Sequence, residues 1–122
     1  MVHDYAPILA AAHVDVLFSG HDHIYERGVG VTPAGKLDYV VSGGGGAPLY
    51  NPTCQAASGP PPVGVPGPLP PCPPSVTVLT NTYHYIMVEV GADAVSLCPK
   101  HPDGSAVEPC VRLPLRQARG GH

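Results

Sequence analysis

Charged side chains are scarce in this sequence of 122 residues. Asp, Glu, Lys and Arg together make up 12% of it, and the formal net charge is −3. Proteins that bind a phosphate backbone carry a basic patch or stripe. Here the basic residues are scattered, with a weak cluster near the C-terminus: Arg27, Lys36, Lys100, Arg112, Arg116 and Arg119. The sequence therefore predicts no nucleic-acid-binding surface.

Long hydrophobic runs are also missing. Spanning a bilayer takes roughly 20 consecutive apolar residues, and no run in this sequence approaches that length. The first residues, 1–4, lack the basic and apolar regions of a secretory signal peptide. At this length the chain is at most one small domain with little apolar surface to spare for a core. We predict no membrane span, and nothing in the sequence specifies an oligomeric state.

The four cysteines contain no C-x-x-C pair, which argues against a zinc ribbon. They fall instead as two flanking pairs. Cys54 and Cys72 bracket a proline-rich segment, and Cys98 and Cys110 bracket a turn at 102–105. Two local disulfides are favoured over free thiols, and disulfides indicate an oxidising compartment. We expect the complete protein to be secreted or periplasmic, with an N-terminal portion that this chain lacks.

The remaining pattern is that of short strands after one N-terminal helix. Asp4 is suited to cap a helix that runs to about Ala12, with Pro7 tolerated in the first turn. Apolar runs and turn residues predict strands at Val14–Phe18, Leu37–Ser42, Val76–Leu79, Thr82–Val90, Ala94–Cys98 and Ala106–Leu113. The range Leu37–Ser42 is mostly apolar and is therefore predicted to be buried on both faces. Residues 28–35 are predicted to form a loop that contains at most a short strand at Val29–Val31. The predicted fold class is α/β, bordering on α+β, and consists mostly of strands.

Residues 51–75 interrupt this pattern with a run of prolines. Proline removes backbone donors and favours extended or polyproline II backbone. We predict a surface insertion that is tethered near its ends by Cys54 and Cys72. A ligand for a proline-binding partner is the alternative, but a solvated loop is favoured. The tail, residues 114–122, is expected to fray.

Two histidines one residue apart follow the apolar run 14–18. In extended backbone, residues two apart project to the same side, so His21 and His23 could reach one small region of space. Neutral imidazole is the commonest nitrogen ligand for zinc, iron and similar ions. Gly20 lets the backbone turn tightly before them. The H-x-H spacing alone occurs often by chance, so its context decides.

The longer string around the histidines gives that context. Residues 18–27, FSGHDHIYER, closely resemble the last metal-ligand block of the calcineurin-like metallophosphoesterases, in the form of the purple acid phosphatase-like group. Residues 39–49, YVVSGGGGAPL, resemble the glycine-rich segment that follows in those enzymes. Residues 83–90, YHYIMVEV, resemble their closing strand. The resemblance runs in the family's order over most of the chain outside the proline-rich segment.

The resemblance implies that residues 1–122 are the C-terminal portion of a β-sandwich flanked by helices. It further implies hydrolysis of a phosphate mono- or diester at a centre of two metal ions, which would be Fe, Zn or Mn. His21 would bind one metal and His23 the other, as catalytic ligands. A bridging water or hydroxide of lowered pKa would attack phosphorus. Asp22, Tyr25 and Arg27 are the residues expected to contact the ligands or the substrate.

The sequence also departs from the family. The earlier blocks D-x-H, G-D-x-x-D and G-N-H are absent, as is the histidine between the third and last blocks, unless His3 or His13 replaces it. One histidine for each of two metals falls short of the three protein ligands of a catalytic zinc site. The chain alone is therefore expected to be inactive. The competing hypothesis is a secreted, disulfide-stapled, β-rich binding module without catalysis.

Several residues near the motif also have structural explanations. For Asp22, a solvated carboxylate or one beside the ligands is favoured over direct ligation. For Arg27, a contact network with Glu26 is favoured over contact with a substrate phosphate. His84 lies on an apolar face, where a core histidine is favoured over a metal ligand. The glycines at 43–46 either pass close to the metal centre or simply end the strand.

Overall fold

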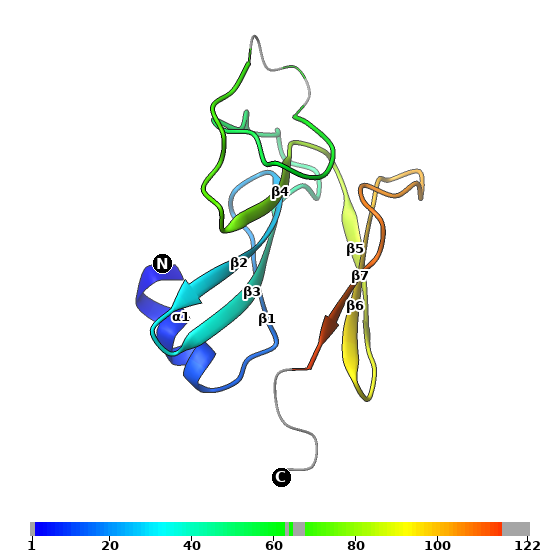
Figure 1. Cartoon of the computed structure of the whole chain (residues 1–122). Helices are drawn as coiled ribbons and strands as arrows, with labels where there is room; N and C mark the ends of the chain where they lie inside the picture. The colour runs from blue at the N-terminus through cyan, green and yellow to red at the C-terminus, as the bar shows by residue number, and fades with distance from the viewer. Residues whose placement is uncertain (1, 63, 65–67, 116–122) are drawn as a thin grey trace.

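The computed structural model of the chain describes residues 2–62, 64 and 68–115, without the side chains of residues 2–5. Its elements are α1 (Val2–Ala11), β1 (Val16–Ser19), β2 (Tyr25–Thr32), β3 (Gly35–Ser42), β4 (Val76–Thr80), β5 (Tyr85–Val90), β6 (Ala94–Lys100) and β7 (Val111–Pro114). Figure 1 shows three layers: α1, the sheet of β1 to β4, and the sheet of β5 to β7. The predicted strand-rich fold with one N-terminal helix is confirmed. Within the described residues, no helix has the length and apolar character needed to cross a membrane.

The strand order of the larger sheet is β1-β3-β2-β4. β1 pairs with β3 in parallel, whereas β2 pairs with β3 and with β4 in antiparallel. The smaller sheet has the antiparallel order β5-β6-β7. Because β3 lies between β1 and β2, the chain that joins β1 to β2 must pass the carboxyl end of β3. This crossing decides where the histidines lie.

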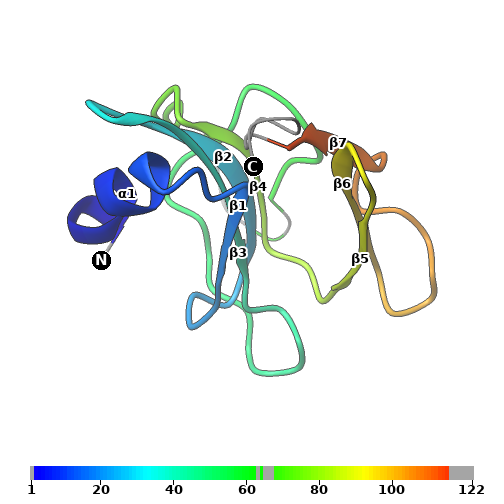
Figure 2. The ribbon, with the colours of Figure 1, turned by 90° about the horizontal axis from the view of Figure 1, so that it is seen from below.

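The hydrophobic core fills the space between the two sheets. Its buried members come from both sheets and from the segment before β7: Tyr25, Val40, Val78, Val95, Leu97 and Val107. On β3, Leu37 and Val40 are each 1% exposed although they point to opposite faces of the strand. The prediction that this strand is buried on both faces is therefore confirmed. The helix α1 packs on the outer face of the larger sheet, mainly over β3 (Figure 2).

The predicted strand at 29–31 is the second half of a longer strand, β2. Gly28 and Gly30 suggested a loop, but β2 continues through both. A β-carbon at Gly28 would lie 2.1 Å from the carbonyl oxygen of Ser75 and 2.7 Å from the Tyr39 hydroxyl. This glycine therefore permits close packing inside a sheet and does not mark a turn.

The C-terminal strand is shorter than predicted. Of the predicted range 106–113, only residues from Val111 onward form β7, and Ala106 makes an isolated bridge to Lys100. Residues 81–84 are likewise not part of β5. Of the tail 114–122, Pro114 ends β7, and residues 116–122 lie outside the described part of the chain.

Both predicted disulfides are present, Cys54–Cys72 and Cys98–Cys110. The proline-rich segment that the first one tethers folds back against β4. Thr80 donates its hydroxyl hydrogen to the carbonyl of Pro61 (3.3 Å). A β-carbon at Gly59 would lie 2.8 Å from the side chain of Val78. The segment therefore covers the edge of the larger sheet with residues that donate few backbone hydrogen bonds.

Candidate functional site

The histidine pair lies in the loop of residues 20–24, called here the histidine loop, between β1 and β2. This loop crosses the carboxyl end of β3, where residues 43–50, called here the glycine segment, leave the sheet. Figure 2 shows both loops at the same end of the larger sheet. The strand order therefore brings the two motifs together although the whole of β2 and β3, residues 25–42, separates them in the sequence.

Direct contacts join the two loops. The backbone N–H of Gly43 donates to the carbonyl of Ile24 (3.0 Å), and that of Tyr50 donates to the carbonyl of His23 (3.1 Å). A β-carbon at Gly43 would lie 2.0 Å from the carbonyl oxygen of Asp22. Only glycine fits such an approach without a backbone shift. The glycine segment thus does more than end β3, because it supports the histidine loop.

His21 adopts an unusual backbone conformation. Its side chain is exposed and its φ is +79°. Left-handed backbone is uncommon for residues other than glycine, and such positions cluster at functional sites. The residues 21–24 form a bend rather than extended chain. Strand alternation therefore does not place His21 and His23 on one side, and that step of the sequence argument is wrong.

The ring of His23 is held by two contacts with the glycine segment. Its Nδ1 lies 2.7 Å from the carbonyl oxygen of Pro48, and its ring stacks on that of Tyr50 at 4.5 Å between centroids. A carbonyl oxygen can only accept, so Nδ1 carries the hydrogen. In the neutral ring this leaves Nε2 with a free lone pair. Metal-binding histidines commonly donate their second nitrogen to a carbonyl in this way.

Further metal ligands are not gathered around these two rings. Within the described part of the chain, no three His, Cys, Asp or Glu side chains are grouped where they could hold a metal ion. The geometry of His23 fits a ligand, but the ligand set is incomplete.

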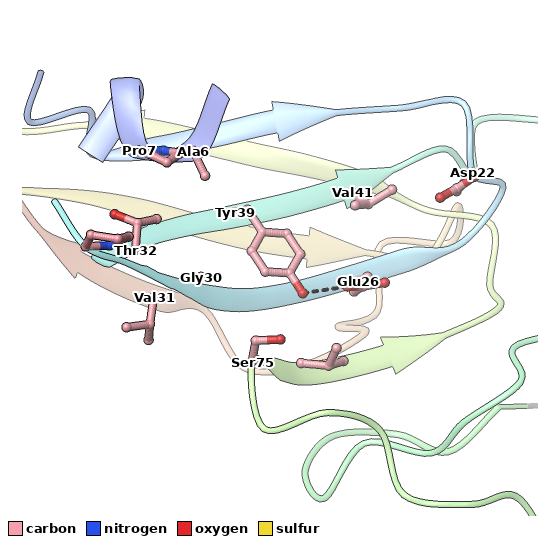
Figure 3. Close-up of a pocket in the computed structure, with 12 residues that line it drawn as sticks. Ala6, Pro7, Asp22, Glu26, Gly30, Val31, Thr32, Tyr39, Val41 and Ser75 are labelled. Carbon is pink, nitrogen blue, oxygen red and sulfur yellow. Dashed lines mark hydrogen bonds between the residues drawn. The ribbon is translucent and has the colours of Figure 1, made fainter. Parts of the chain in front are cut away.

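Asp22 lines a different feature, a cavity of 590 Å³ on the outer face of the larger sheet. Figure 3 shows Asp22 at one end of this cavity, with Glu26 and Tyr39 further along the sheet. The Tyr39 hydroxyl donates to Glu26 Oε2 at 2.5 Å. Burial, followed by this contact with Glu26, raises the pKa of Tyr39. Asp22 is exposed, as expected for a solvated carboxylate.

Tyr25 and Arg27 point the other way, into the space between the sheets, and meet Glu108. Tyr25 is fully buried and donates its hydroxyl hydrogen to Glu108 Oε2 at 2.6 Å. Arg27 donates Nε–H to Oε2 (2.8 Å) and Nη2–H to Oε1 (2.9 Å) of the same carboxylate. The hydrogen bond to Glu108 raises the pKa of Arg27, and burial raises that of Tyr25. We call these three residues the inter-sheet cluster.

The expected contact between Glu26 and Arg27 is not what holds either side chain. Neighbouring residues on a strand point to opposite faces, so Glu26 meets Tyr39 and Arg27 meets Glu108. Glu108 was not anticipated from the sequence. The available signal was the arginine itself, because a charge on a strand that faces the core needs a carboxylate partner.

His84 is a core histidine, as predicted. It is 6% exposed, and both ring nitrogens have partners. Nδ1 lies 2.8 Å from the carbonyl oxygen of Thr82, and Nε2 lies 2.8 Å from the hydroxyl of Ser42. Burial lowers its pKa. His13, expected at the end of the helix, follows α1 with a φ of +60°, the left-handed conformation typical of a helix C-terminus.

No protein-family model matches this sequence, and no curated protein matches it. The relation to the metallophosphoesterases therefore depends on the motifs at 18–27, 39–49 and 83–90, and it stays a prediction. The structure supports a metal-ligand role only through the geometry of the histidine loop and the glycine segment. It shows one imidazole whose Nε2 has no partner among the described residues, a neighbour with a positive φ, and a glycine segment that contacts Asp22, His23 and Ile24.

Proposed function

We propose that this chain supplies His21 and His23 as ligands to the metal centre of a phosphoesterase, which hydrolyses a phosphate mono- or diester. One observation carries the proposal: Pro48 accepts the Nδ1 hydrogen of His23 at 2.7 Å. This contact selects the tautomer that a metal ligand needs and orients the ring. His84 makes the same kind of contact through Nδ1, so what distinguishes His23 is that no described residue bonds to its Nε2.

The backbone around the pair supports the same proposal. His21 keeps a left-handed φ at an exposed position, which costs free energy that a plain surface turn avoids by using glycine or asparagine. Gly43 allows the supporting segment to lie against Asp22. Both features hold the loop in one shape before any ligand binds, which reduces the ordering that binding requires.

Two imidazoles do not complete a catalytic centre, so the remaining ligands would come from residues outside the described part of the chain. Two metal ions of the Fe, Zn or Mn type would supply Lewis acidity and a water of lowered pKa there. The two disulfides favour an oxidising compartment, so we place the protein in the secreted or periplasmic class. A disulfide-stapled binding module without catalysis is the rival function, supported by those bonds.

Zn²⁺ titration of the ¹⁵N-labelled chain tests the ligand assignment. We expect Zn²⁺ to shift the ring Nε2 signal of His23 and the ring signals of His21. His21→Asn and His23→Asn should each weaken Zn²⁺ binding by about tenfold or more. The matched control is His13→Asn, because His13 is also exposed and also has a positive φ. Asparagine tolerates that backbone. Equal binding by all three variants would overturn the assignment.

The reaction itself is tested on the full product of the gene. We expect hydrolysis of bis(p-nitrophenyl) phosphate or p-nitrophenyl phosphate, together with bound metal measured by mass spectrometry. His21→Asn should abolish turnover and lower the metal content, whereas His13→Asn should change neither. A protein that holds no metal and hydrolyses neither substrate would favour the binding module.

A further inference from the structure

His84 connects the glycine segment to the interior of the protein. Its backbone N–H donates to the carbonyl of Gly44 at 3.0 Å. Its ring lies directly against the same residue, because a β-carbon at Gly44 would be 2.5 Å from His84 Nδ1 and 2.5 Å from the carbonyl oxygen of Thr82. Gly44 is therefore clamped between His84 and the backbone of residue 82.

The ring of His84 has its hydrogen-bond directions fixed. Thr82 offers a carbonyl oxygen, which only accepts, so Nδ1 carries the hydrogen. Nε2 then accepts from the hydroxyl of Ser42 at 2.8 Å. The ring also meets Tyr25 edge-on at 5.1 Å between centroids. His84 is only 6% exposed, so water cannot readily replace these partners. The ring therefore holds the Ser42 hydroxyl in one position.

The glycine segment runs from the position held by His84 to the histidine loop. Ser42 and Gly44, both held by His84, flank Gly43, whose N–H bonds to Ile24. The far end of the segment holds His23, through the carbonyl of Pro48 and the ring of Tyr50. A shift at residues 42–44 would therefore be transmitted to the contacts that set the His23 ring.

We propose that His84 is a positioning residue, which holds the glycine segment through Ser42 and Gly44 so that Pro48 and Tyr50 fix the ring of His23 with its Nε2 free. That Nε2 of His23 binds a metal ion rests on the proposed function. The positioning of the His23 ring does not, because it can be measured without metal.

Burial of His84 is consistent with this role. Burial lowers its pKa and outweighs the opposing effect of the hydrogen bond to the Thr82 carbonyl. The ring is therefore neutral at pH 7, and its Nε2 can accept from Ser42. The groups that face the ring are Ser42, Thr82 and Tyr25, with His101 beyond the Thr82 hydroxyl at 3.0 Å.

The test compares four variants of the whole chain. His84→Leu removes both ring hydrogen bonds, and His84→Gln keeps an acceptor for Ser42. Ser42→Ala removes a single hydroxyl. His101→Gln is the matched control, since it perturbs the other side of Thr82 and has no hydrogen bond with the glycine segment. Amide spectra establish that each variant folds.

The first readout is the tautomer of the His23 ring, measured from its ¹⁵N shifts at pH 7.5 without metal. We expect mainly the Nδ1–H form in the natural chain and in His101→Gln, and a mixture of both tautomers in His84→Leu. His84→Gln should restore most of the Nδ1–H form. A purely structural role would lower the unfolding temperature and leave this tautomer ratio unchanged.

The second readout is the dissociation constant for Zn²⁺. We expect it to rise about tenfold in His84→Leu, as when an outer-shell partner is removed, and less in His84→Gln. If His84→Leu does not fold, Ser42→Ala replaces it in the test, and we expect it to change the His23 tautomer ratio and the Zn²⁺ dissociation constant in the same direction. A folded variant with an unchanged His23 tautomer overturns the positioning role. A natural chain that binds no Zn²⁺ overturns the proposed function instead.

Discussion

The inter-sheet cluster and the histidine loop are both polar, but they differ in how many of their polar groups have a partner within the protein. In the cluster, Glu108 accepts from Tyr25 and twice from Arg27, so each charged or polar group has its partner within the protein. In the histidine loop, His23 donates from Nδ1, and no residue that the structure describes bonds to its Nε2. The first arrangement is complete and joins two sheets, whereas the second presents an unused acceptor at the surface.

His23 and His84 show the same contrast within one residue type. Each ring gives its Nδ1 hydrogen to a backbone carbonyl, of Pro48 and of Thr82 respectively. They differ at Nε2, which is free in His23 and bonded to Ser42 in His84. The second nitrogen therefore separates a candidate ligand from a core histidine, and the sequence alone does not reveal it.

The largest expected effect is on the cluster. Glu108→Ala leaves the guanidinium of Arg27 half-buried without its carboxylate and removes the acceptor of the Tyr25 hydroxyl. Breaking a buried ion pair by removing one partner costs about 3–5 kcal/mol, and the side chains here are 19% and 6% exposed. We therefore expect Glu108→Ala to lower the free energy of unfolding by about 3 kcal/mol in urea denaturation.

The control for this change is Glu89→Ala, because Glu89 is exposed on β5. Surface changes of this kind stay within about 0.5 kcal/mol. Tyr25 of the cluster packs edge-on against His84, and we expect this ring contact to leave the His23 tautomer unchanged when Glu108 is replaced. If Glu108→Ala also changed the His23 tautomer in the folded chain, the two regions would be coupled and the contrast between them would fail.

A smaller loss of stability is expected from a substitution in the glycine segment. It should occur at Gly44 and not at the adjacent Gly45. Gly44→Ala places a methyl group 2.5 Å from His84 Nδ1 and from the Thr82 carbonyl oxygen. Such overpacking costs about 1–3 kcal/mol. Gly45→Ala meets nothing within 4 Å, and its backbone is not in the left-handed region. We expect that change to leave the free energy of unfolding unaltered within about 0.5 kcal/mol.

Thermal unfolding measures this pair, and the ring signals of His23 sharpen it. Gly44→Ala should disturb the His23 tautomer, whereas Gly45→Ala should not. Equal stabilities of the two variants would show that His84 does not clamp residue 44. The glycine segment would then give the histidine loop no fixed support, in contrast to the fully bonded inter-sheet cluster.

Local features of this fold were predictable from the sequence. The disulfides follow from cysteines that flank single loops, and the helix end follows from a short helical stretch before His13. The burial of β3 follows from its apolar run. Each of these depends on residues that are close in the sequence, where spacing and propensity carry the information.

The features that the sequence did not predict depend on contacts between residues that are distant in the sequence. Gly28 and Gly30 suggested a loop, because the close approach of Ser75, 47 positions from Gly28, is not visible in the local pattern. Arg27 was expected to contact a neighbour, but its partner Glu108 is 81 positions away. The contact between the histidine loop and the glycine segment depends on the strand order β1-β3-β2, which spacing does not specify.

The smallest expected effect is the dependence of stability on pH, and it concerns His84. Burial lowers its pKa in the folded chain from the ordinary value of 6.5, so between the folded and the ordinary pKa the unfolded chain binds more protons. The free energy of unfolding must therefore fall as pH falls below about 6.5, by at most about 1.4 kcal/mol per pH unit. Tyr25 and Arg27, whose pKa values are raised, stay protonated throughout this range.

Urea denaturation at pH 7.5, 6.5 and 5.5 measures this slope, and His84→Gln provides the comparison. Glutamine does not titrate, so the variant should lose less stability than the natural chain between pH 6.5 and 5.5. Parallel curves for the two proteins would mean that His84 is not the group that resists protonation. Its hydrogen bond with Ser42 would then not depend on a neutral ring, and the glycine segment would need another support.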